Sequence, residues 1–365
     1  MANTFQFIGK ISRRKENAFV EKKFDSGWLI NELNLIMTCG DNVQFLRASG
    51  GMWDEKHSDK NSVMTYKYNE NGKDEPITIA WKDRLDKDVV DSIANYRTYT
   101  VDTETKETRE EIKNSGDEVA IEKSNKKHKI FITAIDFVQW LNRVTSDEKT
   151  KDWVWKVTGD VEYSFSQGRW YRNFVPRRVY HVDASTEPQC VGTIKTFYSE
   201  GCMDEGENDT VFNVYSQYYD NQYKKNCFTP MSLIIANDHE KAKGLKKQYG
   251  KAEDEAVREL GINVTYINGA QKVEITEDML SEDQLEMIED GLITLDDIRK
   301  EMGGSVYGDK KVETRITGIA RGYTSGSKET VFNISDLVKI PSNDAPKTEV
   351  DEDNTVPFDL DDDDI

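Results

Sequence analysis

The feature that most constrains the fold of this chain is a long series of short segments rich in β-branched and aromatic residues, separated by glycine and polar turns. Segments of this kind, bounded by turn residues, predict β-strands. The first series covers 5–11, 29–38, 43–48, 62–68, 77–81, 97–101 and 129–135. Apolar residues at helical spacing predict helices at 86–95 and 136–144. About five short strands and one helix are the content of an OB-type barrel.

A second series begins at Trp153, with strands expected at 154–165, 169–182, 191–198, 210–219 and 232–236. The opening strands of both series place a glycine between apolar residues, at Gly9 and Gly159, and the pattern returns at Gly318. Glycine in a strand permits close approach of a second backbone. We therefore expect a mostly β protein with some α, made of OB-like domains at 1–150 and 151–340. One elaborated barrel with long insertions is the alternative.

Helical signals return in the second half of the chain. Residues 238–260 are strongly charged and predicted helical, and Ser281 with Gln284 forms a capping-box pattern ahead of a stop at Gly291. Thr294 with Asp297 begins a further helix that ends at 303–304. The sequence thus predicts an acidic helical insertion at about 238–303, with its apolar residues packed on the body. From 341 the composition predicts a linker and a disordered acidic tail, 341–365.

The net charge of −19 is concentrated in two segments. Residues 341–365 and 274–301 each carry a net charge of −9, which leaves −1 for the rest of the chain. The body is therefore close to neutral and can present a basic face, so the overall charge does not exclude a nucleic-acid ligand.

The most informative stretch is 166–181, which contains four arginines, four aromatic residues and no acid. Arginine neutralises phosphate and stacks on bases, and aromatic rings accept any base, so this mixture predicts a single-strand binding groove. Its candidate contacts are Arg169, Trp170, Tyr171, Arg172, Phe174, Arg177, Arg178 and Tyr180. A two-sided strand with aromatic residues inward and arginines outward is the structural alternative.

The first domain carries similar features. A basic strand end and several tryptophans predict further contacts at Lys10, Arg13, Arg14, Trp28, Arg47, Trp53, Tyr66, Lys67, Trp81 and Arg84. Packing inside the barrel is the competing interpretation for the large aromatic residues.

The last ten residues combine dense acid with a few apolar side chains. A tail that only solubilises has no need of apolar residues, so the peptide predicts a partner pocket with a basic rim and an apolar slot. The residues of this partner-binding tail are Phe358, Leu360, Asp361, Asp362, Asp363, Asp364 and Ile365.

This tail resembles the acidic C-terminal tip of bacterial and phage single-stranded DNA-binding proteins. Here Val356-Pro357-Phe358 precedes the aspartates, whereas in the bacterial tip Pro-Phe closes the chain. In layout the chain is more similar to phage replication proteins with OB-type domains. The resemblance implies non-catalytic, sequence-independent coating of single-stranded DNA in replication, recombination and repair. It also implies that the tail recruits replication or recombination proteins, and it implies a phage origin.

Enzyme motifs are not found in the sequence: it has no phosphate-binding loop, nucleophile elbow or zinc-protease helix. Two other functions stay open. Carboxylate pairs at Asp102 with Glu104 and at Asp204 with Glu205 allow a metal-dependent nuclease, and the acidity allows a viral protein–protein adaptor. No cofactor is expected, and a structural zinc on His181, Cys190 and Cys202 has a spacing that fits no common finger.

Four scattered cysteines without a C-x-x-C pair predict reduced thiols. No apolar run is long enough to span a bilayer, and the N-terminus has no secretory pattern. We expect a cytoplasmic protein, in the host cell if it is phage-encoded, with single-stranded DNA rather than a membrane as its partner.

Overall fold

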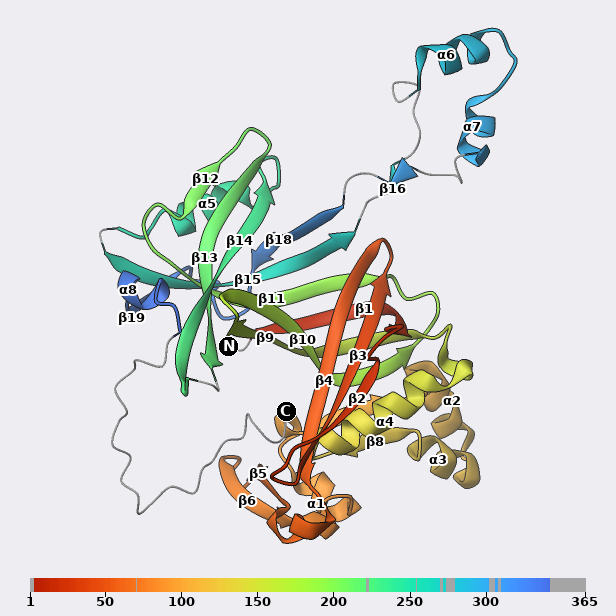
Figure 1. Ribbon diagram of the computed structural model, residues 1–365, viewed down its shortest axis with the longest axis vertical. Coiled ribbons are helices and arrows are strands. Elements are labelled where there is room, and N and C mark those ends of the chain that lie inside the picture. The colour runs from red at the N-terminus through yellow and green to blue at the C-terminus, as the bar shows by residue number, and fades with distance from the viewer. Residues whose placement is uncertain are drawn as a thin grey trace.

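The computed structural model describes residues 3–69, 71–220, 223–253, 255–269, 272–273, 280–301, 306–307 and 310–341. The chain is mostly β, as predicted (Figure 1). The strands are β1 (Thr4–Arg13), β2 (Phe19–Lys23), β3 (Trp28–Cys39), β4 (Asn42–Trp53), β5 (Ser62–Tyr68), β6 (Asp74–Ala80), β7 (Tyr99–Asp102), β8 (His128–Phe131), β9 (Val154–Ser166), β10 (Arg169–Val182), β11 (Gln189–Tyr198), β12 (Met203–Glu205), β13 (Asp209–Asp220), β14 (Lys225–Ala236), β15 (Ala256–Gly269), β16 (Lys272–Val273), β17 (Val306–Tyr307), β18 (Lys311–Ile319) and β19 (Lys328–Asn333).

The α-helices are α1 (Lys87–Ser92), α2 (Lys106–Ser115), α3 (Glu118–Asn125), α4 (Ala134–Ser146), α5 (Ala242–Tyr249), α6 (Glu282–Glu289), α7 (Leu295–Glu301) and α8 (Ile334–Leu337). Short 3-10 turns occupy Glu55–Lys60, Trp81–Asp83, Asn95–Arg97 and Glu148–Thr150. Within the described ranges, no helix is both long and apolar enough to cross a membrane.

The first barrel is a closed ring of five strands. β1 pairs antiparallel with β3 and β9, β3 pairs with β4, and β9 pairs with β10. A parallel bridge between Phe174 of β10 and Leu46 of β4 closes the ring. If the five strands are numbered in chain order, they follow one another around the ring as first, second, third, fifth and fourth. In the sequence, α4 lies between the third strand and the fourth. This arrangement is that of an OB-type barrel.

The second barrel repeats this topology. β11 pairs antiparallel with β13 and β15, β13 with β14, and β15 with β18. A parallel bridge between Ile234 of β14 and Arg315 of β18 closes the ring, and α5 lies between the third and fourth strands. The chain therefore contains two OB-type barrels, and their topology is established by strand pairing alone.

The two barrels are joined edge to edge, and their cores are continuous. β1 of the first barrel pairs antiparallel with β11 of the second, with Thr4 beside Thr193 and Gln6 beside Val191. Behind this seam the ring of Tyr266, from the second barrel, lies 4.9 Å from Phe174 and 5.9 Å from Phe7 of the first barrel. All three residues belong to one buried cluster that spans both barrels.

Strand pairing does not follow the domain boundary expected between 150 and 151. β9 and β10 lie beyond that boundary, yet they pair with β1 and β4 and complete the first barrel. We propose that the boundary lies at 183–188, between β10 and β11.

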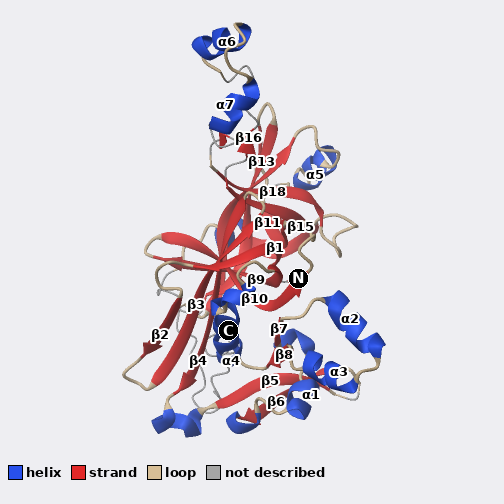
Figure 2. Cartoon of the chain, turned by 90° about the vertical axis from the view of Figure 1, so that its right-hand side faces the viewer, coloured by secondary structure: helices blue, strands red, loops and turns tan. Residues whose placement is uncertain are grey.

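The helical insertion predicted at 238–303 is only partly correct. Within it, 256–269 forms β15, a central strand of the second barrel, because Val257, Leu260, Ile262, Val264 and Tyr266 supply buried side chains. The later helices are confirmed: α6 carries the Ser281–Gln284 capping box, and Thr294 bonds Asp297 at the start of α7. With β16 and β17 these helices form an arm that projects from the body, so its apolar residues do not pack there as expected (Figures 1 and 2).

Two of the three strand glycines allow close backbone approach, as predicted. A Cβ at Gly9 would lie 2.1 Å from the carbonyl oxygen of Thr38, and one at Gly159 would lie 1.9 Å from that of Val175. Gly318 has no such contact, since a Cβ there would meet only the Lys241 side chain at 3.4 Å. The opening strand of the second barrel instead carries Gly192, in Val191-Gly192-Thr193-Ile194, a repeat that sequence reasoning missed.

Replacing Gly159 by alanine should destabilise the first barrel. The added methyl group would overlap the Val175 carbonyl oxygen, and a backbone neighbour inside a paired sheet cannot move aside cheaply. We expect a loss of about 3 kcal/mol in the free energy of unfolding, at the upper end of overpacking effects. Urea denaturation measures this, with Gly318→Ala as the matched control that should stay within about 1 kcal/mol of wild type.

Candidate nucleic-acid interface

The seam between the barrels creates a continuous outer sheet face. Along one row, Arg178 of β10 lies beside Thr158 of β9, Thr158 beside Gln6 of β1, and Gln6 beside Val191 of β11. Alternation along these strands turns their apolar neighbours inward and leaves the row on the outside. The outer sheet face therefore continues from the first barrel to the second with no unpaired strand edge between β10 and β11.

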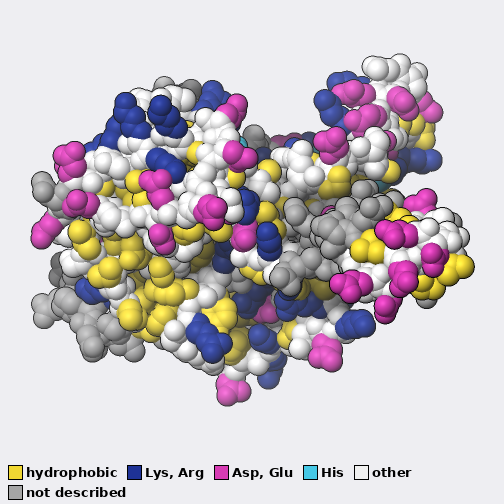
Figure 3. All heavy atoms as spheres, turned by 90° about the horizontal axis from the view of Figure 1, so that it is seen from above, with side chains coloured by type: hydrophobic (Ala, Val, Ile, Leu, Met, Phe, Trp, Pro, Cys, Tyr) yellow, Lys and Arg dark blue, Asp and Glu magenta, His cyan; other side chains and the backbone are white. Residues whose placement is uncertain are grey.

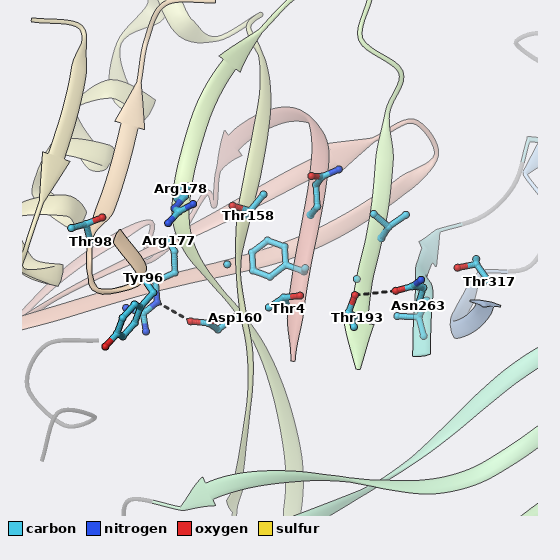
Figure 4. Close-up of a pocket in the computed structure, with 16 residues that line it drawn as sticks. Thr4, Tyr96, Thr98, Thr158, Asp160, Arg177, Arg178, Thr193, Asn263 and Thr317 are labelled. Carbon is cyan, nitrogen blue, oxygen red and sulfur yellow. Dashed lines mark hydrogen bonds and ion pairs between the residues drawn. The ribbon is translucent and has the colours of Figure 1, made fainter. Parts of the chain in front are cut away.

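This face is hollowed into a groove of about 530 Å³. Figure 4 shows Tyr96, Arg177 and Arg178 on one side of it and Thr193, Asn263 and Thr317 on the other. The floor between them is made by Thr4, Gln6, Thr158 and Asp160, so most of the polar groups along it are uncharged. We call this the junction groove, lined by Thr4, Phe5, Gln6, Tyr96, Thr98, Thr158, Gly159, Asp160, Arg177, Arg178, Val191, Gly192, Thr193, Asn263, Val264 and Thr317.

The two arginines of the junction groove differ in their surroundings. Arg177 donates to the Asp160 carboxylate at 2.8 Å and to the Tyr99 hydroxyl at 2.8 Å, so its charge is already balanced. Arg178 donates to the carbonyl oxygen of Asn95 at 3.0 Å, and no carboxylate in the described part of the chain pairs with it. The Arg178 guanidinium therefore has further N–H groups that can donate hydrogen bonds to a phosphate.

Tyr96 supplies an aromatic ring at the same wall. Its ring is 47% exposed, and the guanidinium of Arg97 lies 5.3 Å from the ring centroid. Its hydroxyl donates to the Asp74 carboxylate at 2.6 Å, which fixes the ring and raises the pKa of Tyr96. A fixed, exposed ring beside an unpaired arginine can take a stacked base next to a bound phosphate.

A second candidate surface is the outer face of β3 and β4, the face on which OB-type barrels bind oligonucleotides. Phe45 is 45% exposed there, with the guanidinium of Arg14 lying 4.8 Å from its ring centroid. Arg47 lies two residues further along β4 and is held by Glu32 at 2.6 Å. We call Arg14, Phe45 and Arg47 the barrel-face cluster.

The predicted tryptophans at the end of this sheet pack mainly on each other. Trp28 and Trp53 are cross-strand partners with ring centroids 5.2 Å apart, and the Trp28 indole lies against Gly51. Lys60 lies 4.5 Å from the Trp53 ring centroid. Both rings are half-buried, so they shape the end of the sheet and offer only part of their area to a ligand.

The acid-free strand β10 places its residues on two sides. Phe174 is 4% exposed and belongs to the core, so its predicted contact with nucleic acid is wrong. Trp170 packs against Phe165 and Tyr218, and Arg172 reaches the second barrel by donating to Thr314 at 3.1 Å. Phe174 and the half-buried Trp170 pack inward, and Arg172, although exposed, also contacts the second barrel, so all three connect the barrels. The outward ones are Arg169, Tyr171, Arg178 and Tyr180, of which Arg178 alone lines the junction groove.

Several predicted contacts of the first domain are structural. Arg84 forms a two-point contact with Asp136 at the start of α4 and stacks on Trp81, whose ring packs on a small apolar cluster. Arg13 donates to Asn142 and Ser146 at the end of α4. The guanidinium of Arg97 covers the Tyr66 ring. Lys67 lies 3.9 Å from Glu75, and Lys10 is exposed and lies 3.3 Å from Asp152.

The carboxylate pairs considered for a nuclease are engaged by basic side chains. Asp102 contacts Arg109 at 2.6 Å and His128 at 2.8 Å, and Glu104 contacts Lys127 at 2.8 Å. Burial alone would raise the pKa of Glu104, but the bonds from Lys127 and Ser124 outweigh it, so its pKa is lowered. Glu205 contacts Lys246 at 2.7 Å.

The residues considered for zinc do not converge. His181 stacks on Trp153 with ring centroids 4.0 Å apart, and the neighbouring Cys39 thiol, together with burial, raises the pKa of Cys190. In the described ranges, no group of three His, Cys, Asp or Glu side chains is placed to hold a metal ion. The predicted tail residues, from Phe358 to Ile365, lie outside the described residues.

Comparison with known proteins gives no family assignment. No family model matches the chain, and no curated protein matches it. Two solved structures of the single-stranded DNA-binding protein from Thermus aquaticus are similar in part, one of a deletion variant and one of the wild type. The match to the deletion variant covers 73% of this chain and 86% of the Thermus aquaticus chain, at 9% identity and a TM-score of 0.29. The second covers 72% and 85%, at 9% identity and a TM-score of 0.28. At this level of similarity neither fold nor function is inferred from them.

Proposed function

We propose that this chain binds single-stranded DNA without sequence preference, by neutralising phosphates and stacking bases. The observation that carries the proposal is the junction groove, which crosses the seam of two OB-type barrels and has Arg178, without a carboxylate partner among the described residues, and the exposed Tyr96 on the same side. Because both groups line the same side of one groove, a single strand can place a phosphate on Arg178 and a base on Tyr96.

Single strands fit this surface better than a duplex does. The stacking platforms, Tyr96 and Phe45, can be reached only by bases that are unpaired and unstacked from a partner strand. Duplex DNA shows its phosphates outward and its bases inward, so it would use Arg178 and Arg14 but neither ring.

Under this proposal the protein has no catalytic activity and works in DNA replication or recombination. The acidic tail, including Phe358 and Leu360, would recruit replication or recombination proteins, as its resemblance to the tips of single-stranded DNA-binding proteins suggests. The nuclease alternative has less support because its described carboxylates pair with lysine, arginine or histidine.

Photocrosslinking locates the bound strand. The intact protein is irradiated with a bromodeoxyuridine-substituted oligonucleotide, and the crosslinked peptides are identified by mass spectrometry. We expect crosslinks at Tyr96 and Phe45, the exposed rings of the two surfaces. Crosslinks confined to the outer face of β13 and β14 would contradict the proposed path.

Replacing Phe45 by alanine should weaken single-strand binding by at least about 1 kcal/mol, because one stacking platform and its cation–π partner are lost. Phe45 is 45% exposed, so the fold should be unaffected. Fluorescence anisotropy with a labelled oligothymidylate measures the change. Phe24→Ala, an equally exposed ring outside the barrel-face cluster, is the control.

A further inference from the structure

The helical arm and helix α5 carry opposite charges at different sides of the second barrel. Residues 280–301 of the arm contain eight acids and two basic residues, whereas 241–251, which include α5, contain five lysines and no acid. The arm projects from one side of this barrel and α5 lies at the other (Figure 1). Each is therefore open to a neighbouring molecule rather than to its counterpart in the same chain.

The arm presents apolar side chains among its acids. Leu292 is 69% exposed and Met287 is 42% exposed, and the two adjoin because the Leu292 N–H donates to the Met287 carbonyl oxygen at 3.0 Å. Glu286, Glu289 and Asp290 are exposed at the same end of α6, and no basic side chain of the described residues pairs with these three. Seen from above, the projecting arm shows acidic and hydrophobic side chains together (Figure 3). An apolar centre with a charged rim is typical of a protein-docking surface.

Helix α5 presents the complementary charge. Lys243 and Lys247 lie one turn apart on its exposed side, and Lys251 follows just past its end. In the described part of the chain these three have no carboxylate partner, whereas Lys246 is held by Glu205. The same barrel has a hollow of about 320 Å³ over the paired strands β13 and β14, lined by Asn213, Val214, Tyr215, Pro230, Met231 and Ser232. Exposed lysines and a hollow with both apolar and polar lining are thus available on one barrel.

We propose that the arm of one copy of this chain docks on the second barrel of another copy. Glu286, Glu289 and Asp290 would face Lys243, Lys247 and Lys251, and Leu292 with Met287 would enter the hollow between β13 and β14. Because the two surfaces differ, the contact is head-to-tail, and it repeats from copy to copy unless the rotation between copies closes it into a ring. The inference does not depend on nucleic-acid binding.

Sedimentation velocity of the intact protein tests this contact. The weight-average sedimentation coefficient should rise with protein concentration at low salt, and the rise should shrink as salt screens the charges. Two charge-reversed variants make the test specific: Glu286→Lys/Glu289→Lys/Asp290→Lys on the arm, and Lys243→Glu/Lys247→Glu/Lys251→Glu on α5. Each alone should associate at least about tenfold more weakly than wild type, since like charges then face each other.

Mixing the two reversed variants gives the decisive result. In the mixture the lysines of the reversed arm meet the glutamates of the reversed α5. The wild-type arm of the second variant likewise meets the wild-type α5 of the first, so opposite charges face each other again and association should return. A mixture that stays monomeric, or a single variant that associates as wild type does, would overturn the proposal. If α5 reversal instead lowers affinity for an oligothymidylate and leaves self-association unchanged, the lysines bind nucleic acid and the proposal is wrong.

A further variant tests the same contact with a smaller change, in case the charge-reversed proteins misfold. Leu292→Ser changes one exposed side chain, so far-ultraviolet circular dichroism should match wild type. Its self-association should weaken several-fold because the apolar centre of the contact is lost. Unchanged self-association of this folded variant would also count against the proposed contact.

Discussion

Replacing Tyr96 and Arg178 together by alanine should weaken single-stranded DNA binding more than any other pair of changes in the outer face. Loss of the Tyr96 ring removes a stacking platform, about 1–3 kcal/mol, which corresponds to roughly 5- to 150-fold in affinity. Loss of Arg178 removes one phosphate contact, so the slope of log K against log salt should become shallower by about 0.7. Anisotropy titrations with a labelled oligothymidylate at several salt concentrations measure both effects.

Matched variants distinguish the contribution of the Tyr96 ring to DNA affinity from that of its hydroxyl. They also distinguish a loss specific to the junction groove from a loss that any exposed ring or charge would cause. Tyr96→Phe keeps the ring and loses the bond to Asp74, so it should bind nearly as tightly as wild type. Tyr219→Ala removes a ring of similar exposure (44%) from β13, outside the junction groove, and Lys113→Ala removes a positive charge from α2. Equal losses in these controls would show that binding is diffuse and would contradict the assigned site.

Replacing Tyr266 by alanine should destabilise both barrels at once. Tyr266 is fully buried where the two cores meet, in edge contact with Phe7 and Phe174 of the first barrel. Deleting a large buried ring removes its transfer free energy and leaves a cavity, so we expect a loss of about 3–5 kcal/mol. Because the cavity lies in a shared core, the two barrels should still unfold in a single transition at lower denaturant concentration.

The conservative variant Tyr266→Phe is an informative control. The Tyr266 hydroxyl is buried without a hydrogen-bond partner among the described residues, and burial raises the pKa of this group. Removing an unsatisfied polar group costs little, so Tyr266→Phe should be as stable as wild type or more stable. Urea denaturation followed by tryptophan fluorescence and by circular dichroism measures both variants. Two separate transitions in wild type would contradict a shared core.

Local patterns in the sequence predicted most barrel strands. Alternation and turn residues gave β5 and β10 with their observed bounds, and the capping box placed the start of α6. The error at 256–269 has a physical cause: charged residues at 251–259 dominate the composition there, whereas burial of Leu260, Ile262 and Val264 in the second barrel determines the strand. Helices α2 and α3 were missed because few of their residues are apolar, so no helical stripe stands out.

Partner choice between strands could not be predicted from local patterns. The sequence shows that β9 and β10 are strands, but only tertiary pairing places them in the first barrel with β1 and β4. The residues of the binding site could not all be predicted for the same reason. Arg178 was predicted, yet Tyr96 and Phe45 were missed because neither lies in the arginine-rich window, and only the fold brings Tyr96 beside Arg178. Phe174 was misassigned because it faces the core, and the register shift between Pro176 and Arg178 is what places Arg178, four residues later, on the outer side.

A salt titration by fluorescence anisotropy, comparing labelled single-stranded and duplex DNA, tests the central claim most directly. Intact protein and a 1–340 truncation are measured side by side, since the acidic tail can compete with DNA for basic groups. The account predicts tighter binding to the single strand, affinity that falls as salt rises, and stronger binding by the truncated chain. Absence of binding by either form at low salt, or equal affinity for duplex and single strand, would contradict it.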